Sequence, residues 1–201
     1  MKLVGSQTSP YVRKVRVMLA EKKLACEFAE DNVWSEATTV TAANPLTKVP
    51  VLLLDDGTAL YDSSVITDYL DPIGAPSFLP ASGIARALVK RNESLGDGIT
   101  DAGIAIFLER KRTPEKQDTA WLARQRGKID AGIAALSSEL GARPYLRGEN
   151  VTLGDIACGC GLFWLEFRLP EIAWRAQYPN LGAWAARLEA RPSFAATKPP
   201  A

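Results

Sequence analysis

Short apolar blocks separated by polar turns make up the first 70 positions of the chain. They predict a strand over 2–5, a helix over 10–23 with apolar residues at helical spacing, and a strand over 25–29. A strand, a helix and a second strand in succession are typical of a parallel βαβ unit. The stretch VPVLLLDDGTALY predicts a β-hairpin with its turn at Asp-Gly, and a helix over 63–70 follows. We therefore expect a small α/β domain here.

The rest of the chain has the period of helices and no predicted strand. The stretch DPIGAPSFLPASG holds three prolines and two glycines, which marks a linker. Beyond it, apolar residues recur three or four positions apart, which predicts a helical bundle. The expected organisation is an α/β domain over 1–72, a linker over 73–83 and an all-helical domain over 84–201. The helices are expected over 82–112, 114–140, 152–168 and 180–190.

Composition and charge narrow the kinds of partner and chemistry. Hydrophobic residues make up 47% of the chain and the net charge is +1 without a basic run, so neither a membrane protein nor a nucleic-acid-binding protein is expected. The longest apolar run, 156–165, is too short to span a bilayer, and no secretory signal is expected at the N-terminus. Three cysteines make no disulfide framework, which favours a reducing cytosol.

The chain contains no histidine, and this restricts its chemistry. Histidine is the usual general base and a common metal ligand, so no metal is expected. Hydroxyls, carboxylates, Lys, Arg, backbone amides or a bound cofactor must carry the chemistry.

The turn GSQTSPYV leads from the first predicted strand into the first predicted helix. Ser9 followed by Pro10 is a favoured helix start, because Ser caps the free amides and Pro suits the first helical position. The same turn follows the carboxyl end of a strand, where ligands of open α/β sheets bind, and a helix N-terminus attracts anions. Ser9 is therefore either a cap alone or a ligand-binding residue.

Two further stretches are suited to an anion. In NPLTKVPVL, Lys48 precedes Pro50 at the predicted start of a strand, although it can equally be a solvated loop lysine. In YDSSVITDYL, Asp62 and Ser63 lie where a helix begins, and a helix cap is the simpler explanation for this position. Together with Ser9 they suit a ligand with separated carboxylates.

At this point the motifs resemble those of the glutathione S-transferases over nearly the whole chain. The matching stretches are TSPYVRKV, NPLTKVPVL, LYDSSVITDYL, TLGDIA and PNLGAWAARLEARPSF. Each is weak alone, but five in order are specific. The chain also resembles a small bacterial branch whose members open with MKLVGS, one variable residue and TSP. The resemblance implies a thioredoxin-like N-terminal domain, an all-α C-terminal domain, a homodimer and glutathione as cosubstrate.

The resemblance also implies roles for single residues. Ser9 corresponds to the family's activating Ser or Cys, and Tyr11 is a second candidate because other classes use an N-terminal Tyr. Thr47 stands where Gly is common, so that turn is expected to differ slightly. The shorter Asp62 stands where Glu or Gln is more frequent, which leaves its direct contact with the ligand open. The implied glutathione-binding residues are Ser9, Lys48, Val49, a cis Pro50, Asp62 and Ser63.

Candidates in the helical half have plainer alternatives. In related enzymes an acidic residue on the long helix reaches the partner subunit's glutathione, which makes Asp101 a candidate, although a solvated acidic stripe is the simpler explanation. The electrophile pocket is expected near Phe107 and Arg110. Phe163, Trp164, Phe167, Cys158 and Cys160 are expected in the core, Thr152 and Asp155 in a capping box, and Gly98 and Gly103 in close helix packing.

The sequence therefore predicts a cytosolic, dimeric glutathione transferase that conjugates glutathione to small hydrophobic electrophiles in detoxification. A protein of the same fold that binds glutathione or apolar ligands without turnover is the main alternative, since fold does not fix function. A glutathione-dependent peroxidase or reductase is the third, and Ser at position 9 argues against its Cys-dependent form because Ser forms no mixed disulfide.

Overall fold

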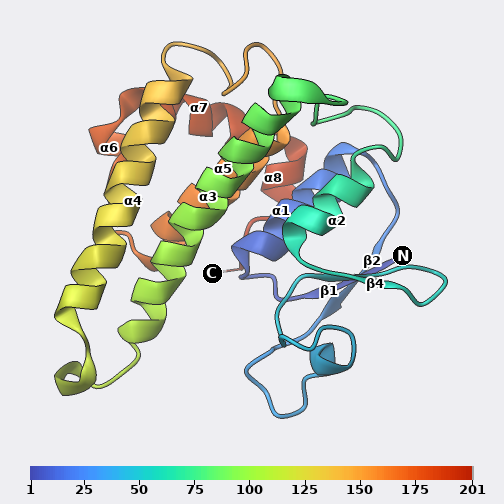
Figure 1. Cartoon of the computed structure of the whole chain (residues 1–201), viewed down its shortest axis with the longest axis horizontal. Helices are drawn as coiled ribbons and strands as arrows, with labels where there is room; N and C mark the ends of the chain where they lie inside the picture. The colour runs from blue at the N-terminus through green and yellow to red at the C-terminus, as the bar shows by residue number, and fades with distance from the viewer. Residues whose placement is uncertain (201) are drawn as a thin grey trace. The chain divides into compact units, whose positions relative to one another are not determined.

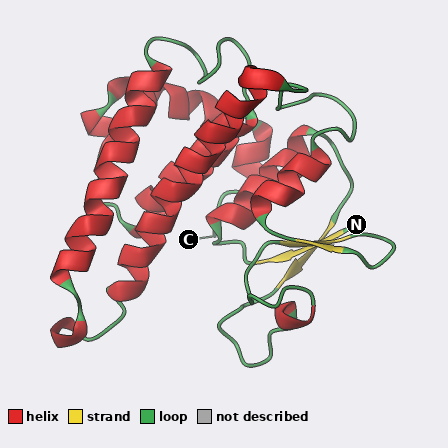
Figure 2. Ribbon diagram, in the orientation of Figure 1, coloured by secondary structure: helices red, strands yellow, loops and turns green. Residues whose placement is uncertain are grey.

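The computed structural model describes residues 1–200 and divides into two compact units, each taken by itself below. Unit 1 comprises Met1–Leu79 together with the segment from Glu189 onward, and unit 2 is Pro80–Leu188. Figure 1 labels the elements along the chain, and Figure 2 separates helices from strands by colour. Unit 1 contains β1 (Lys2–Gly5), α1 (Pro10–Glu21), β2 (Glu27–Glu30), the 3₁₀ turn η1 (Val40–Ala42), β3 (Val51–Leu53), β4 (Ala59–Leu60), α2 (Ser63–Leu70) and α8 (Pro192–Ala196).

The four strands form one mixed sheet in the order β2-β1-β3-β4. β1 pairs in parallel with β2, and α1 makes the crossover between them, as the predicted βαβ unit requires. β3 pairs antiparallel with β1 and β4, which gives the predicted hairpin. α1 and α2 lie side by side against the sheet (Figure 1).

Alternating residues of the strands bury both faces of this sheet. Val4 and Val51 face each other across the β1–β3 ladder and pack with Val40 of η1. Their neighbours Leu3 and Leu52 are also paired and buried, and they point to the opposite face because successive strand residues alternate. The sheet is thus held from both sides, which fixes the loops at its ends.

The C-terminal segment joins unit 1, whereas the sequence analysis assigned it to the helical domain. Arg191 donates to both carboxylate oxygens of Glu21 at 2.7 Å, and Ser193 donates to the same carboxylate at 2.5 Å. The buried guanidinium of Arg13 donates to the Phe194 carbonyl at 3.1 Å. These long-range contacts with α1 place the segment in unit 1. The hydrophobic period along the sequence predicts helices but does not show which distant segment a helix contacts.

Unit 2 is all-helical, as expected. The helices that start at Gly83, Leu153 and Pro179 begin within one residue of the predicted positions, while the short helix α6, which has no side-chain cap, was not predicted. Residues 114–116 form a separate 3₁₀ turn rather than the start of the next helix, because Asp118 caps that helix by accepting from the Trp121 amide at 2.9 Å. The elements are α3 (Gly83–Glu109), η2 (Pro114–Lys116), α4 (Thr119–Leu140), α5 (Leu153–Arg168), α6 (Trp174–Gln177) and α7 (Pro179–Glu189).

α5 is the central helix of unit 2, with every residue from Leu153 to Leu165 buried. Its expected capping box is present: the Thr152 amide and hydroxyl donate to Asp155 Oδ2 at 2.9 and 2.7 Å. Asp155 Oδ1 also accepts from the Leu146 amide at 2.8 Å and from the Trp184 indole at 2.9 Å. Asp155 therefore ties a helix start to two distant segments.

Close packing of α3 against α5 depends on Gly96. A Cβ on Gly96 would lie 2.7 Å from the Cys158 backbone nitrogen, whereas a Cβ on Gly98 would meet nothing within 4 Å. The prediction for Gly98 was therefore wrong, because Gly98 does not face α5. Gly103 was predicted correctly, since its Cβ would lie 2.5 Å from the Leu165 side chain. Cys158, Cys160, Phe163 and Trp164 are buried as expected, and Phe167 is half-buried.

Candidate active site

Sheet topology brings three loop ends to one edge of unit 1. Because β1 and β3 are antiparallel with Val4 opposite Val51, the end of β1 lies beside the start of β3. β3 and β4 are also antiparallel, with Leu52 opposite Leu60, so the end of β4 lies at the same edge. The residues after β1, before β3 and after β4 therefore converge. These are the three stretches that the sequence analysis selected.

Ser9 is the N-cap of α1. Its hydroxyl oxygen accepts from the Val12 amide at 3.3 Å, and Pro10 takes the first helical position. In the described part of the chain this is the hydroxyl's one hydrogen bond, so its O–H donor is available to a ligand. The first turn of α1 carries no acidic residue, so the positive end of the helix is not neutralised from within. Ser9 is a cap and is also equipped to hold an anion.

The turn before Ser9 is held by its own polar groups. Ser6 and Thr8 hydroxyls are 3.1 Å apart, and the Ser9 amide donates to the Ser6 carbonyl at 3.1 Å. The Gln7 amide donates to Glu30 Oε1 at 3.2 Å, which ties the turn to β2. Tyr11, the second candidate, is half-buried and is the second residue of α1. The turn thus presents Ser9 from a fixed loop.

The segment before β3 has the shape that the resemblance implied. The Val49–Pro50 peptide bond is cis, and Thr47 has φ of 52°, in the left-handed region that favours glycine. The buried Asn44 side chain donates to the Lys48 carbonyl at 2.9 Å and accepts from the Leu46 amide at 3.0 Å. The sequence analysis did not select Asn44, although Asn before Pro is a recognisable turn signal.

Lys48 is exposed, and no carboxylate of the described residues lies within ion-pair distance of it. Its cation therefore faces solvent at the edge where the three loops converge.

Asp62 and Ser63 begin α2. Asp62 Oδ1 accepts from the Ser64 amide at 2.9 Å and from the Ser64 hydroxyl at 2.6 Å, so Asp62 caps the helix as expected. Ser63 is 3% exposed, and its hydroxyl has no hydrogen-bond partner within the described residues. The carboxylate is thus occupied locally, while a hydroxyl beside it remains available.

The buried Lys14 on α1 adds a positive charge to this site. Partial burial raises the pKa of the Asp62 carboxyl, but the Ser64 hydrogen bonds and the Lys14 charge lower it, and the net pKa lies below its ordinary value. Lys14 is 1% exposed. Lys14 was not among the residues selected from the sequence, although its position beside apolar residues of a helix could have indicated that it is buried.

Three candidates lie on α3 in unit 2. Asp101 is exposed, and Arg110 at the end of α3 forms an ion pair with Glu171. The half-buried Phe107 packs edge-on against Trp164, with ring centroids 5.9 Å apart. Phe107 and Arg110 thus share the last turns of α3, and the Arg110 charge is taken by Glu171.

Among residues 1–200, no helix is long and apolar enough to cross a membrane. Across the same residues, no three His, Cys, Asp or Glu side chains are grouped so that they could hold a metal ion.

Known proteins resemble both units. The glutathione S-transferase N-terminal domain family matches residues 3–76, and the C-terminal domain family matches residues 119–187. The uncharacterized GST-like protein YibF of Escherichia coli strain K12 is 37% identical over 201 residues, covering 100% of this chain and 99% of its own length.

Two solved structures are similar over the full length. A glutathione S-transferase of Methylobacterium radiotolerans, in complex with glutathione sulfonate, is 45% identical with a TM-score of 0.95, covering 100% of this chain and 95% of its own. One from Methylobacillus flagellatus, with glutathione bound, is 40% identical with a TM-score of 0.96, covering 99% of both chains. The expected fold, a thioredoxin-like unit and a helical unit, is confirmed. The chain belongs to the glutathione S-transferase family.

Proposed function

We propose that the protein is a glutathione transferase, which binds glutathione on unit 1 and conjugates its thiolate to small hydrophobic electrophiles. The observation that carries the proposal is the convergence of Ser9, the cis Val49–Pro50 segment and Ser63 at one sheet edge. Similar structures from other bacteria contain glutathione or glutathione sulfonate, which supports the same ligand here.

Glutathione carries two carboxylates, an amine and a thiol, and the converging loops offer a partner to each end. The Ser63 hydroxyl and the first amides of α2 suit the γ-glutamyl carboxylate, and Asp62 suits the amine because its lowered pKa keeps it ionised. The Val49 backbone, before Pro50, would pair with the cysteinyl backbone. The exposed Lys48 would approach the glycyl carboxylate.

The Ser9 hydroxyl is sufficient to ionise the bound thiol. A free thiol with a pKa of about 8.5 is only about 3% thiolate at pH 7. A hydrogen bond to a charged group contributes about 1.5–3 kcal/mol, which lowers the thiol pKa by roughly one to two units. The N-terminus of α1 adds about 0.3–1 kcal/mol. The bound thiol then titrates near pH 6–7 without a general base, consistent with a chain that lacks histidine.

Conjugation replaces the leaving group on the electrophile's carbon with the glutathione sulfur. The thiol proton leaves to solvent, and the thiolate attacks the carbon that bears the leaving group. The C–S bond forms, the bond to the leaving group breaks, and the leaving group departs with its electron pair. With a chlorinated nitroaromatic the products are the aryl conjugate and chloride.

The Ser9→Ala variant tests the role of the hydroxyl. We expect kcat/KM with a chlorinated nitroaromatic to fall roughly 10- to 100-fold, from the hydrogen-bond magnitude above. The absorbance of bound thiolate should show a thiol pKa raised by one to two units. Because Ser9 is also a helix cap, Asp118→Ala is the matched control: it removes the cap of α4 at similar cost in stability, and activity should persist.

Other outcomes select the alternatives. Unchanged kinetics and thiol pKa in Ser9→Ala would refute the role of Ser9, and a loss of activity in Tyr11→Phe instead would transfer it to Tyr11. Glutathione binding without a conjugate identifies the non-catalytic binding protein. Reduction of a hydroperoxide with glutathione, in the absence of conjugation, identifies the peroxidase.

We also propose a cytosolic homodimer that acts in detoxification. Cys26, Cys158 and Cys160 are thiols rather than disulfides, which suits a reducing compartment. The exposed apolar side chains of Val65 and Tyr69 on α2 suit a subunit interface. Light scattering of the purified protein measures its mass, and a monomer at micromolar concentration would refute the dimer.

A further inference from the structure

An aromatic cluster lies where α3 and α5 end in unit 2. Phe107 of α3 and Phe167 of α5 are half-buried, so each leaves ring surface exposed. Trp164 is buried behind Phe107 at an interplanar angle of 81°, which fixes the orientation of the Phe107 ring.

Two cations lie over these rings. The guanidinium carbon of Arg168 is 3.9 Å from the Phe167 centroid and 5.5 Å from the Phe107 centroid. The Lys111 ammonium is 4.7 Å from the Phe107 centroid. Both lie within the distance at which a ring face attracts a cation. A guanidinium stacked in this way still presents its N–H groups along its edge.

The edge of Arg168 has no acidic partner. No carboxylate of the described residues lies within ion-pair distance of it. The neighbouring carboxylates are engaged elsewhere: Glu171 with Arg110, and Glu109 with the Asp118 amide at 2.9 Å. Arg168 is therefore a half-buried cation, stacked on aromatic rings, whose donors are not matched by an anion from unit 2.

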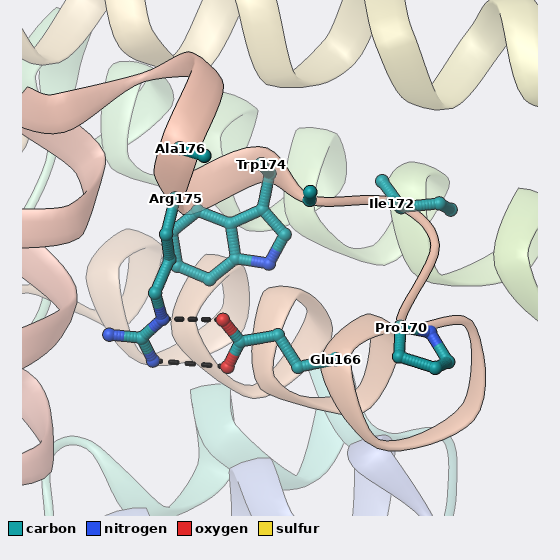
Figure 3. A pocket seen from close by; sticks show the side chains of 7 residues that line it. Glu166, Pro170, Ile172, Trp174, Arg175 and Ala176 are labelled. Carbon is teal, nitrogen blue, oxygen red and sulfur yellow. Dashed lines mark hydrogen bonds and ion pairs between the residues drawn. The ribbon is translucent and has the colours of Figure 1, made fainter.

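Arg175 in the same unit shows what completes such an arrangement. Its guanidinium also stacks on aromatic rings, 4.8 Å from the Trp174 centroid and 5.4 Å from the Phe163 centroid. Along its edge, however, Glu166 accepts two hydrogen bonds, one of them at 3.0 Å (Figure 3). A planar, two-oxygen anion thus fits the edge of a stacked guanidinium in this fold. Arg168 has the rings and lacks the anion.

We propose that Arg168, Phe107 and Phe167 form a binding site for aromatic carboxylates and sulfonates. The acid group pairs with the edge of Arg168, and the ligand's ring packs on the exposed phenylalanine rings. Lys111 adds a second positive charge. If the proposed transferase activity holds, this site selects electrophiles that carry an acid group on an aromatic ring; the binding itself does not depend on that activity.

The first experiment measures binding without glutathione. Titration calorimetry on the whole protein compares naphthalene-2-sulfonate with the neutral naphthalene-2-sulfonamide, which has a similar shape. We expect the sulfonate to bind at least about tenfold more tightly, and the advantage to shrink at high salt. Equal affinities would overturn the proposal, and this comparison needs no variant.

Variants then identify the residue. Arg168→Gln should weaken sulfonate binding about 10- to 100-fold and leave sulfonamide binding unchanged, whereas Arg168→Lys should be intermediate because it keeps the charge but loses the fork. Lys128→Gln is the matched control, since Lys128 also lies over a ring, 6.0 Å from the Trp121 centroid. If Arg168 only stabilises the end of α5, Arg168→Gln will have a lower Tm and an unchanged sulfonate affinity, and that result would overturn the proposal.

Kinetics connect the site to the proposed function. The ratio of kcat/KM for 4-chloro-3,5-dinitrobenzoate to that for 1-chloro-2,4-dinitrobenzene should fall about tenfold or more in Arg168→Gln. An unchanged ratio overturns the assignment to electrophile selection. If neither compound is turned over, the proposed transferase activity is refuted, and calorimetry alone then tests the binding site.

Discussion

Replacement of Asp155 by Ala should strongly destabilise unit 2. The carboxylate is 0% exposed and accepts four hydrogen bonds, from the Thr152 amide and hydroxyl, the Leu146 amide and the Trp184 indole. Ala removes every acceptor at once. Thr152 moves with the helix start and can reach water, but Leu146 and Trp184 are both 0% exposed.

The magnitude follows from those contacts. Each of the two buried donors left without an acceptor costs about 1–3 kcal/mol. Loss of the capping arrangement at the start of α5 adds about 0.5–2 kcal/mol. Together these lower the free energy of unfolding by about 5 kcal/mol, which corresponds to a Tm lower by about 10–20 °C at about 2–4 °C per kcal/mol.

Thermal and urea unfolding, followed by circular dichroism and tryptophan fluorescence, measure the change. Asp155→Asn should lower the free energy of unfolding by about half as much. Its carbonyl oxygen keeps the hydrogen bonds from Leu146 and Trp184, while its NH₂ group faces the Thr152 amide and cannot accept from it. Asp130→Ala removes a surface carboxylate that pairs with Arg126 at 2.8 Å and should cost less than about 1 kcal/mol. A loss below about 1 kcal/mol in Asp155→Ala would refute the reasoning.

Two further changes test packing and pH dependence. Gly96→Ala should destabilise the protein by about 1–3 kcal/mol, because its Cβ meets the Cys158 backbone. Gly98→Ala should stabilise it by about 0.5–1 kcal/mol, because its Cβ meets nothing within 4 Å and Ala favours the helix. Urea unfolding measures both variants, and equal effects would contradict the close approach of α3 and α5. Burial raises the pKa of Glu21, but the hydrogen bonds of Arg191 and Ser193 and the charge of Arg191 outweigh it, so the pKa lies below its ordinary value. The resulting stability is present above about pH 4.3 and is lost as the pH falls through the lowered pKa. Glu21→Gln should flatten that part of the Tm-against-pH curve, and an unaltered slope would show that the ion pair contributes nothing.

Local signals in the sequence predicted the helix starts well. Three helix starts depend on a capping side chain that bonds within the next three residues: Ser9 followed by Pro10, Asp62, and the box of Thr152 and Asp155. Because these bonds are local, the residue types alone predict them. Contacts between distant segments were not predictable in this way. Asp155 reaches Trp184 across 29 positions, and nothing in the capping motif indicates that second role.

The candidate site was predictable to the same extent. Strand pairing explains why the turn at Ser9 and the start of α2 lie at one edge, and both stretches were recognisable. Lys14 was not, because a lysine in a helix is usually solvated and only the packed structure shows it buried near Asp62. Gly96 and Gly98 are equivalent in sequence terms, and only the position of α5 distinguishes them.

The two-part construction of unit 1 has a consequence for biosynthesis. The ribosome makes α1 early, but Arg191 and Phe194, which contact that helix, follow only after all of unit 2. At about 5–20 residues per second, the 170 positions from Glu21 to Arg191 delay this pairing by on the order of 10–30 s. Throughout that interval Arg191 and Phe194 cannot yet contact Glu21 and Arg13, so the part of α1 that the C-terminal segment covers in the folded protein is still exposed.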